Sequence, residues 1–341
     1  MVNVNILTLQ DYTCFLQQWD KNAFPPSEFL FVENSKDDII WDCVVVYEGV
    51  KIPTYIKYKK GGLIFISGEP PMSRVYPCSF TKQFDHLITA HPNLNHPHNH
   101  VTQQGLNWHY GLSYIQKRYT TDFNSIKNLE VPPKTKLISV ITSTQKMMPG
   151  HNLRSIIIRK LEEKYSDVID FYGKGRRFVD DKAEALLPYK FHICMENSYI
   201  PDYWTEKFAD PIIAYSVPIY AGCKNLKSYF PHGGYFQFDI HSFKQVESII
   251  DSIIENPDEV YQNNLSDLML NREAILNQYN TIPMIVDFYN RYIKKEQDEK
   301  TVNTTIMPST CFSSYKYLLW LLRIKRLMTK ICINTKSCLK I

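Results

Sequence analysis

The sequence predicts an α/β protein with two Rossmann-like domains and a helical tail at the C-terminus. Its 341 residues are enough for two domains, and a composition of 44% hydrophobic and 22% charged residues is typical of globular proteins. Near-continuous apolar runs at 39–46 and 63–67 have the character of buried parallel strands. A strand-then-helix pattern then starts again after a proline-containing linker at 130–136.

The first predicted domain covers residues 1–130. Its opening stretch, 1–19, reads as a strand and a helix-like segment, and short apolar runs separated by turns fill 28–70. Since the opening stretch has neither a basic n-region nor a long apolar run, we expect no signal peptide and no membrane anchor there. Glu69 follows the strand at 63–67, where open α/β sheets place ligands. The simpler alternative is an exposed turn glutamate.

Four histidines within 91–100 suggest either a metal site or a polar loop. Neither H-E-x-x-H nor a helical i,i+4 pair is present, and two prolines impose an irregular loop, so we favour a polar loop that contacts an acceptor through His91. Trp108 could stack on a sugar ring or simply pack within the domain.

The second predicted domain covers residues 136–293. We expect strands at 137–142 and 168–175, with a helix between them at 153–165. Arg154 lies in the first turn of that helix, where it could bind an anion or remain solvated. Arg176 and Arg177 follow the second strand and are further cationic candidates.

Residues 189–218 carry the most informative pattern. An alternating strand is followed by the polar turn 196–198 and then by a helix with Thr205 as N-cap. A strand that leads to a helix N-terminus makes an anion site. Four side chains there suit a nucleotide sugar: Asn197, Tyr203, Glu206 and Lys207. The Lys207 cation would face phosphate, the Glu206 carboxylate would accept hydrogen bonds from hydroxyl groups, and the Tyr203 ring would cover the ligand. The alternative is a solvated Glu-Lys pair in a helix's first turn.

The last predicted segment is residues 294–341. A charged run at 294–300 and a linker-like stretch at 301–308 precede an apolar and basic stretch at 314–333. This stretch is too short and too charged to span a bilayer comfortably, and it suits an amphipathic helix on anionic lipid. A C-terminal helix docked on the body of the protein is the alternative.

Charge and cysteine content exclude some classes of protein. The formal net charge of +4 provides no field that favours nucleic acid. The eight cysteines include no C-x-x-C pair and no zinc-type spacing, so reduced thiols in a cytosolic protein are the simplest interpretation.

One ordered set of motifs resembles a known family. Tyr189-Lys190-Phe191, Glu196-Asn197-Ser198, Asp202 to Lys207, and Val217-Pro218-Ile219 resemble the donor-binding signature of the α-1,3-fucosyltransferases, glycosyltransferase family 10. Two positions depart from that pattern. Ser216 replaces a small residue or glycine, and Pro211 should kink the helix or delay its start.

The resemblance implies a GT-B-like fold, with an acceptor-binding first domain and a GDP-fucose-binding second domain that face a cleft. It implies an inverting transfer of fucose to a GlcNAc-containing glycan, with Glu69 as general base and Arg154 as a pyrophosphate ligand. It implies no required metal, although Mn²⁺ or Mg²⁺ could stimulate the reaction. A bacterial-type member would be cytoplasmic and peripheral on the inner membrane face.

Two other functions remain open at this point. One is a different nucleotide-sugar transferase of the same fold, and the other is a non-catalytic protein that binds glycans or membrane surfaces.

Overall fold

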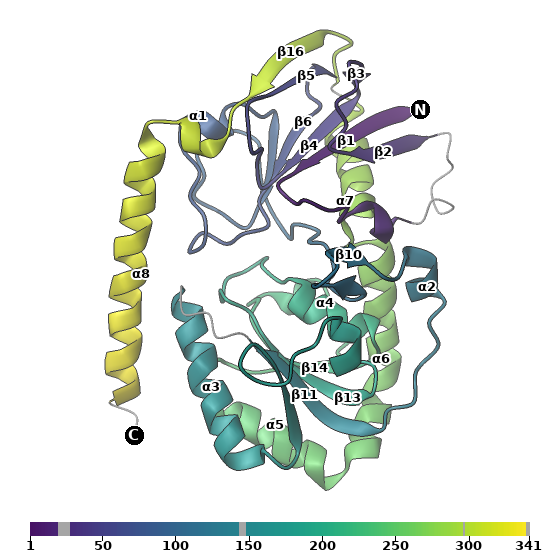
Figure 1. The fold of residues 1–341 in the computed structure, drawn as a ribbon, viewed down its shortest axis with the longest axis vertical. Helices are drawn as coiled ribbons and strands as arrows, with labels where there is room; N and C mark the ends of the chain where they lie inside the picture. The colour runs from purple at the N-terminus through teal and green to yellow at the C-terminus, as the bar shows by residue number, and fades with distance from the viewer. Residues whose placement is uncertain (20–27, 143–147, 296, 339–341) are drawn as a thin grey trace. The chain divides into compact units, whose positions relative to one another are not determined.

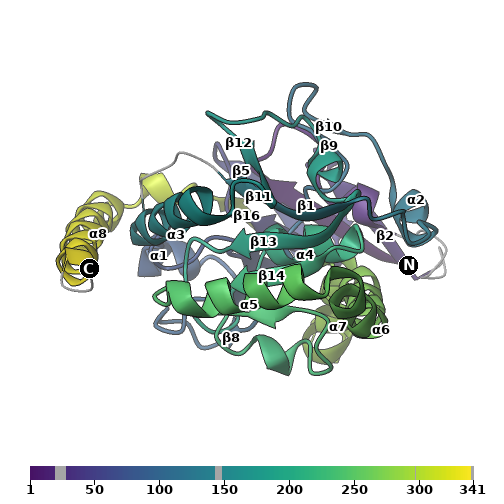
Figure 2. The ribbon, with the colours of Figure 1, turned by 90° about the horizontal axis from the view of Figure 1, so that it is seen from below.

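The chain divides into two compact units. The computed structural model describes residues 1–19, 28–142, 148–295 and 297–338 (Figures 1 and 2). Unit 1 comprises residues 1–107 and 279–325, and unit 2 comprises 108–278 and 326–341. The division therefore lies at 107/108 and not in the predicted linker at 130–136. Asp210 accepts hydrogen bonds from the backbone N–H groups of His109 and Tyr110, which ties this segment to unit 2.

Unit 1 is built on a six-stranded parallel sheet in the order β2-β1-β4-β6-β7-β8. The strands are β1 (Val2–Thr8), β2 (Phe29–Glu33), β4 (Cys43–Tyr47), β6 (Leu63–Ile66), β7 (His86–Thr89) and β8 (Asn99–Val101). Strands β4 and β6 are buried along their whole length, as their apolar runs predict. The helical segments are η1 (Leu16–Gln18), α1 (Cys78–Thr81), α7 (Thr281–Phe288), a π-helical turn (Tyr289–Ile293) and η5 (Ser309–Cys311).

A second, three-stranded sheet completes unit 1. It has the order β16-β5-β3 and consists of β3 (Ile40–Trp41), β5 (Thr54–Lys59) and β16 (Thr301–Ile306). Strand β16 pairs antiparallel with β5 over six residue pairs. The prediction of a linker at 301–308 is thus wrong. The segment alternates between exposed and less exposed residues, but its threonines and asparagine give no apolar pattern that a sequence reading would recognise as a strand.

Unit 2 contains a five-stranded parallel sheet in the order β12-β11-β13-β14-β15. The strands are β11 (Lys136–Thr142), β12 (Ile169–Gly173), β13 (Tyr189–Met195), β14 (Val217–Ala221) and β15 (Phe236–Gln237). The main helices are α3 (Pro149–Tyr165), α4 (Glu206–Ile213), α5 (Phe243–Glu255) and α6 (Pro257–Asn277). Shorter elements are β9 (Leu112–Ser113), β10 (Arg118–Tyr119), α2 (Phe123–Lys127), η2 (Lys182–Ala185) and η3 (Leu226–Ser228).

The predicted α/β class is confirmed. In each unit, the first strand lies between the second and the third, and all strands of the main sheet run parallel, which is the doubly wound arrangement. In this arrangement, ligands bind beyond the carboxyl ends of the strands, where the strand order reverses. The expectation that the two domains face a cleft concerns their relative placement and stays a prediction.

Helix α4 begins where the sequence predicts. Thr205 is its N-cap and accepts a hydrogen bond from the N–H of Lys207 at 3.2 Å. Pro211 lies inside the helix but does not delay its start. Because proline lacks only its own N–H donor, the helix keeps its first turn and ends soon afterwards, at Ile213.

The basic C-terminal stretch forms helix α8 (Ser314–Cys338). Among the described residues, no helix is both long and apolar enough to cross a bilayer.

The N-terminal turn of α3 packs closely against the turn that follows β13. A Cβ on Gly150 would lie 2.2 Å from the backbone oxygen of Asn197, which follows β13. We expect Gly150→Ala to lower the free energy of unfolding by about 1–3 kcal/mol through overpacking. Helix propensity alone predicts a gain of about 1 kcal/mol from the same change. Chemical denaturation distinguishes the two signs.

The control is Ser155→Ala, an exposed position on the same helix whose hydroxyl donates only to the carbonyl of His151. It should be neutral or slightly stabilising. A stabilised Gly150→Ala variant would show that α3 and the turn at Asn197 can separate without cost.

Candidate functional site

A cavity of about 690 Å³ lies in unit 2 at the carboxyl ends of its parallel strands. The strand ends supply Thr142, Gly173 and Met195, and the helices supply Arg154 from α3 and Glu206 and Lys207 from α4. The remaining lining residues are His109, Tyr114, Ile141, Lys174, Gly175, Arg176, Phe178, Val179, Lys182, Leu186, His192, Ile193, Cys194, Asp210 and Pro211. The cavity therefore occupies the place where a doubly wound sheet binds its ligand.

The carboxylate of Glu196 sets the start of α4. Its side chain is fully buried directly after β13 and accepts hydrogen bonds from the N–H and the hydroxyl of Thr205, both at 2.8 Å. Thr205 Oγ1 in turn lies 3.2 Å from Lys207 Nζ. Because Thr205 is fixed on both sides, the first turn of α4 presents Glu206 and Lys207 to the cavity.

Glu206 and Lys207 form a charged pair at this turn. Lys207 Nζ lies 3.1 Å from Glu206 Oε1 and 3.5 Å from Glu196 Oε2. Burial by itself would raise the pKa of Glu206, but Lys207 and Lys182 outweigh burial and hold that pKa well below the usual carboxyl range. Burial would likewise lower the pKa of Lys207, yet Glu206 and Glu196 raise it. Both side chains are therefore ionised at neutral pH.

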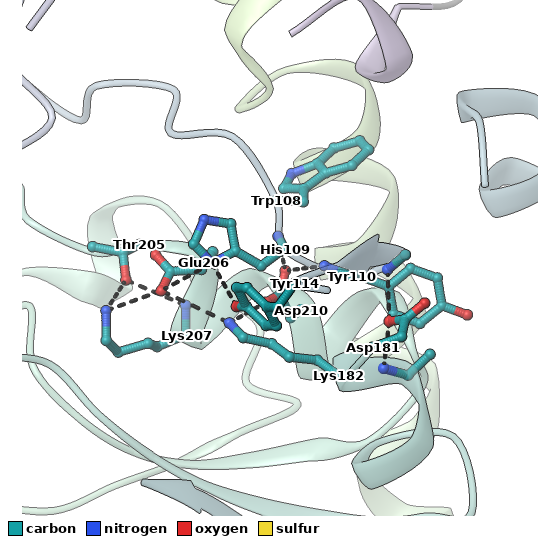
Figure 3. Close-up of polar contacts among 12 residues, drawn as sticks. Trp108, His109, Tyr110, Tyr114, Asp181, Lys182, Thr205, Glu206, Lys207 and Asp210 are labelled. Atoms are coloured by element: carbon teal, nitrogen blue, oxygen red, sulfur yellow. Dashed lines mark hydrogen bonds and ion pairs between the residues drawn. The ribbon is translucent and has the colours of Figure 1, made fainter. Parts of the chain in front are cut away.

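A second ion pair lies one turn further along α4. Lys182 Nζ, from η2, lies 2.7 Å from Asp210 Oδ2 and 3.8 Å from Glu206 Oε1 (Figure 3). Asp210 Oδ1 also accepts from the backbone N–H groups of His109 at 2.9 Å and Tyr110 at 3.1 Å. Asp210 thus joins three separate segments of unit 2 around the cavity.

His109 and Tyr114 form the polar side of this cluster. Tyr114 OH lies 3.1 Å from His109 Nδ1, and that nitrogen is 3.9 Å from Glu206 Oε1. Burial, together with Lys182 and Lys207, lowers the pKa of His109 to about 4 despite the nearby Glu206. The imidazole is therefore neutral at pH 7, and it offers a hydrogen bond and no charge.

The cavity suits an anionic ligand. Five cationic side chains line it (Arg154, Lys174, Arg176, Lys182 and Lys207), against the two carboxylates Glu206 and Asp210. Arg154 Nη1 donates to the carbonyl of Met195 at 3.3 Å, while its buried Nε has no hydrogen-bond partner among the described residues. An unsatisfied N–H donor beside an excess of cations is the feature that an anion such as a diphosphate would complement.

The structure places the predicted donor residues in two groups. Arg154, Glu206 and Lys207 line the cavity, whereas Asn197 and Tyr203 do not. The backbone of Asn197 lies against Gly150 at the start of α3, and Tyr203 is buried after the turn. The binding roles of all five residues stay predictions.

Two of the other predicted residues lie together in unit 1. Glu69 is half-buried after β6, and His91 Nε2 lies 2.7 Å from the backbone oxygen of Glu69. Trp108 lies in unit 2, where it is 2% exposed and stacks against Phe123 with ring centroids 6.5 Å apart. It does not line the cavity, and its burial favours the packing alternative.

The sequence reading missed four cavity residues: His109, Tyr114, Lys182 and Asp210. Asp210 could have been found, because it follows Glu206 by four residues and so shares its helix face. The others come from loops and short turns distant in sequence, for which no local pattern exists. Within the described part of the chain, no group of three histidine, cysteine, aspartate or glutamate side chains is arranged to hold a metal ion.

A family model matches the segment that supplies every cavity residue except His109 and Tyr114. Residues 131–266 match the family model described as glycosyltransferase family 10 (fucosyltransferase) C-term. A fucosyltransferase-like protein from Arabidopsis thaliana is 39% identical over 84 residues, which is 24% of this chain and 16% of that protein. An alpha-(1,3)-fucosyltransferase from Helicobacter pylori is 35% identical over 75 residues, 22% of this chain and 15% of that protein. The family resemblance is therefore confirmed for residues 131–266.

Solved structures give a more distant likeness. An alpha1,3-fucosyltransferase with GDP covers 82% of this chain and 93% of its own, with a TM-score of 0.45 and 15% identity. A complex described as alpha1,3-fucosyltransferase with GDP-fucose has the same TM-score and 16% identity.

The pair of Lys182 and Asp210 should be strongly coupled. Asp210→Asn keeps an acceptor for His109 and Tyr110 but leaves the lysine ammonium buried without its partner. We expect it to lower the free energy of unfolding by about 3–5 kcal/mol. The double variant with Lys182→Met should lose less than the sum of the two single variants. Chemical denaturation of all four proteins measures the coupling.

A matched control is Lys190→Met, since the partner of Lys190 is the exposed Asp258, 3.2 Å away. That change should cost at most about 1 kcal/mol. Additive losses in the Lys182 and Asp210 cycle would contradict the coupling.

Proposed function

We propose that the protein is an inverting fucosyltransferase that moves L-fucose from GDP-β-L-fucose to a hydroxyl group of a GlcNAc-containing glycan. The observation that carries this proposal is the cation-lined cavity at the carboxyl edge of the unit 2 sheet. Apart from His109 and Tyr114, its lining residues belong to the segment that matches the family, and they include the Glu206 and Lys207 pair of the signature. The α-1,3 linkage and an N-acetyllactosamine-type acceptor are parts of the proposal that rest on the relatives.

Donor binding in this proposal uses the charges of the cavity. Arg154 and Lys207 bind the diphosphate, and the dipoles of α3 and α4 favour negative charge at their N-terminal turns. Glu206 accepts from ribose or fucose hydroxyls, because its low pKa keeps it ionised. Asn197 and Tyr203 support the rest of the donor.

Catalysis follows from where charge develops. As the bond between fucose C1 and the diphosphate oxygen breaks, its electron pair leaves with GDP, and Arg154 and Lys207 stabilise the growing negative charge. The acceptor oxygen forms its bond to C1 from the opposite face, which inverts the anomeric centre. The proton of that hydroxyl goes to a carboxylate, which we assign to Glu69. His91 is the proposed contact of the acceptor glycan, and the corresponding prediction for Trp108 would require its buried ring to become exposed.

The proposal requires no metal cofactor. Lysine and arginine side chains already supply the positive charge that a divalent cation would provide to a diphosphate. Mn²⁺ or Mg²⁺ would then act only as a stimulant. The relevant partners are GDP-fucose and the glycan acceptor, and nucleic acid is not among them.

The first test measures GDP release from GDP-fucose with and without an N-acetyllactosamine acceptor. We expect acceptor-dependent release. Arg154→Gln should reduce kcat/KM by about tenfold or more, because the arginine stabilises charge in the transition state. Arg159→Gln is the matched control, since Arg159 lies on the same helix, is exposed and pairs only with Glu163 four residues on.

Equal losses of kcat/KM in the Arg154 and Arg159 variants would show that Arg154 has no specific role in donor binding. Turnover of another GDP- or UDP-sugar in preference to GDP-fucose would indicate a different nucleotide-sugar transferase. An absence of turnover with any donor would indicate a non-catalytic protein that binds glycans or membranes.

We also propose that α8 holds the protein on the cytoplasmic face of an anionic membrane. Tyr317, Trp320, Ile324, Leu327 and Ile331 recur at helical spacing and are each at least 40% exposed. The basic residues Lys316, Arg323, Lys325, Arg326 and Lys330 belong to the same helix. An exposed apolar stripe on a basic helix suits the surface of an anionic bilayer.

Vesicle flotation tests this membrane proposal. The chain should float with vesicles that contain phosphatidylserine and should not float with phosphatidylcholine alone. Replacing Arg323, Lys325, Arg326 and Lys330 by glutamine should abolish flotation, since each basic residue contributes about 1 kcal/mol near such a surface. Binding that survives this replacement would show that charge is not what attracts the helix.

A further inference from the structure

The backbone of Glu69 is held from both sides by buried polar groups of unit 1. Its N–H donates to Glu48 Oε1 at 2.7 Å. Its carbonyl oxygen lies 2.7 Å from His91 Nε2 and accepts from Ser67 Oγ at 3.0 Å. Because both ends of the peptide are fixed, the turn that carries the Glu69 side chain has little freedom.

These contacts belong to one polar cluster. Tyr76 OH donates to Glu48 Oε2 at 3.0 Å, and its oxygen also lies 2.9 Å from Ser67 Oγ. Glu48, Tyr76, Ser67 and His91 thus lie around the Glu69 peptide, and we call them the Glu69 cluster. Glu48, Ser67 and His91 each follow the end of a parallel strand, β4, β6 or β7.

The turn before Glu69 is closely packed. A Cβ on Gly68 would lie 2.4 Å from Tyr47 OH, so a larger residue there would force the tyrosine side chain to move. Glu48 itself has a φ of +65°, in the left-handed region that residues other than glycine seldom adopt. Such a backbone persists where the surrounding structure over-determines it, and it is often found at functional sites.

Glu48 is also electrostatically coupled to Glu69. Burial, and then the neighbouring Glu69, raise the pKa of Glu48 to about 7, against the opposing influence of Arg74. Arg74 Nε lies 3.7 Å from Glu48 Oε2, and Tyr76 donates to the same carboxylate. Burial lowers the pKa of His91, which is therefore neutral at pH 7. Glu69, Tyr76 and Tyr315 also act electrostatically on the guanidinium of Arg74.

We propose that Glu48 is a positioning residue for Glu69, because it accepts the hydrogen bond from the Glu69 N–H and so fixes the peptide that carries the Glu69 side chain. This inference rests on the proposed function, in which Glu69 takes the proton of the acceptor hydroxyl.

The test compares Glu48→Ala and Glu48→Gln with wild type in acceptor-dependent transfer. The alanine variant removes the acceptor of the Glu69 N–H, whereas the amide side chain of the glutamine variant keeps an oxygen there. We expect kcat to fall about tenfold in Glu48→Ala and to recover in Glu48→Gln, since positioned general bases contribute about 10² or more. The KM for GDP-fucose should stay unchanged in both variants, because the donor cavity is lined by residues of unit 2 alone.

Recovery in the conservative variant and the split between kcat and KM are the readouts that a merely structural role would not move. A misplaced general base lowers kcat and leaves donor binding unchanged. Should Glu48→Ala fail to fold, Tyr76→Phe tests the same cluster. It removes the hydroxyl that donates to Glu48 and should lower kcat by less.

The matched control is Glu33→Ala. Glu33 is another carboxylate of unit 1 that accepts backbone N–H groups, from Cys14, Phe15 and Leu16, and it lies outside the Glu69 cluster. This variant should lose stability without a fall in kcat. An active wild type with equal kcat values in Glu48→Ala and Glu33→Ala would overturn the positioning role and leave the proposed function intact. An inactive wild type would instead overturn the proposed function, and the role of Glu48 in it.

Discussion

The candidate donor site depends on one buried carboxylate. Glu196 is fully buried after β13 and accepts from both the N–H and the hydroxyl of Thr205. These bonds decide where α4 begins, and the start of a helix decides which side chains share its cavity face. Glu206 and Asp210 come to the same face for that reason, and Lys207 returns to Glu196 itself at 3.5 Å. Without the Glu196 carboxylate, the first turn of α4 would lose both the capping contact and the partner of its lysine.

The same device occurs in both units. In unit 1, Glu48 follows β4 and accepts from the N–H of Glu69, and in unit 2, Glu196 follows β13 and accepts from the N–H of Thr205. In each case, a carboxylate at the carboxyl end of a parallel strand fixes a backbone N–H. In unit 1 that N–H belongs to Glu69 itself, and in unit 2 it belongs to Thr205, which directly precedes Glu206. We assign a function to the side chains of Glu69 and Glu206. Backbone N–H groups at such turns need an acceptor when they are buried. Using a carboxylate as that acceptor also places a charge within reach of the site.

The charge cluster of unit 2 is better explained by ligand binding than by stability. Burying ion pairs costs desolvation that their mutual attraction only partly offsets, so well-packed apolar side chains would serve stability as well. Yet Lys182, Glu206, Lys207 and Asp210 each have side chains that are at most 26% exposed, and all line the same cavity. Their mutual pairing keeps them ionised and oriented before a ligand arrives. Preorganised charges of this kind stabilise a transition state without the cost of reorganisation.

The sequence by itself determined the α/β class, the strand and cap around Glu196 and Thr205, and the Glu206 and Lys207 pair, because these features depend on local periodicity and capping. It also singled out Arg154, although α3 begins at Pro149, four residues before the predicted start, and Arg154 lines the cavity from the second turn. Only the tertiary structure decided which distant segments complete the site. Lys182 and His109 join Asp210 through contacts over 28 and 101 residues, and β16 pairs with a strand more than 240 residues earlier. Such contacts depend on how the strands are ordered and how the loops close, and no local pattern of residues encodes either.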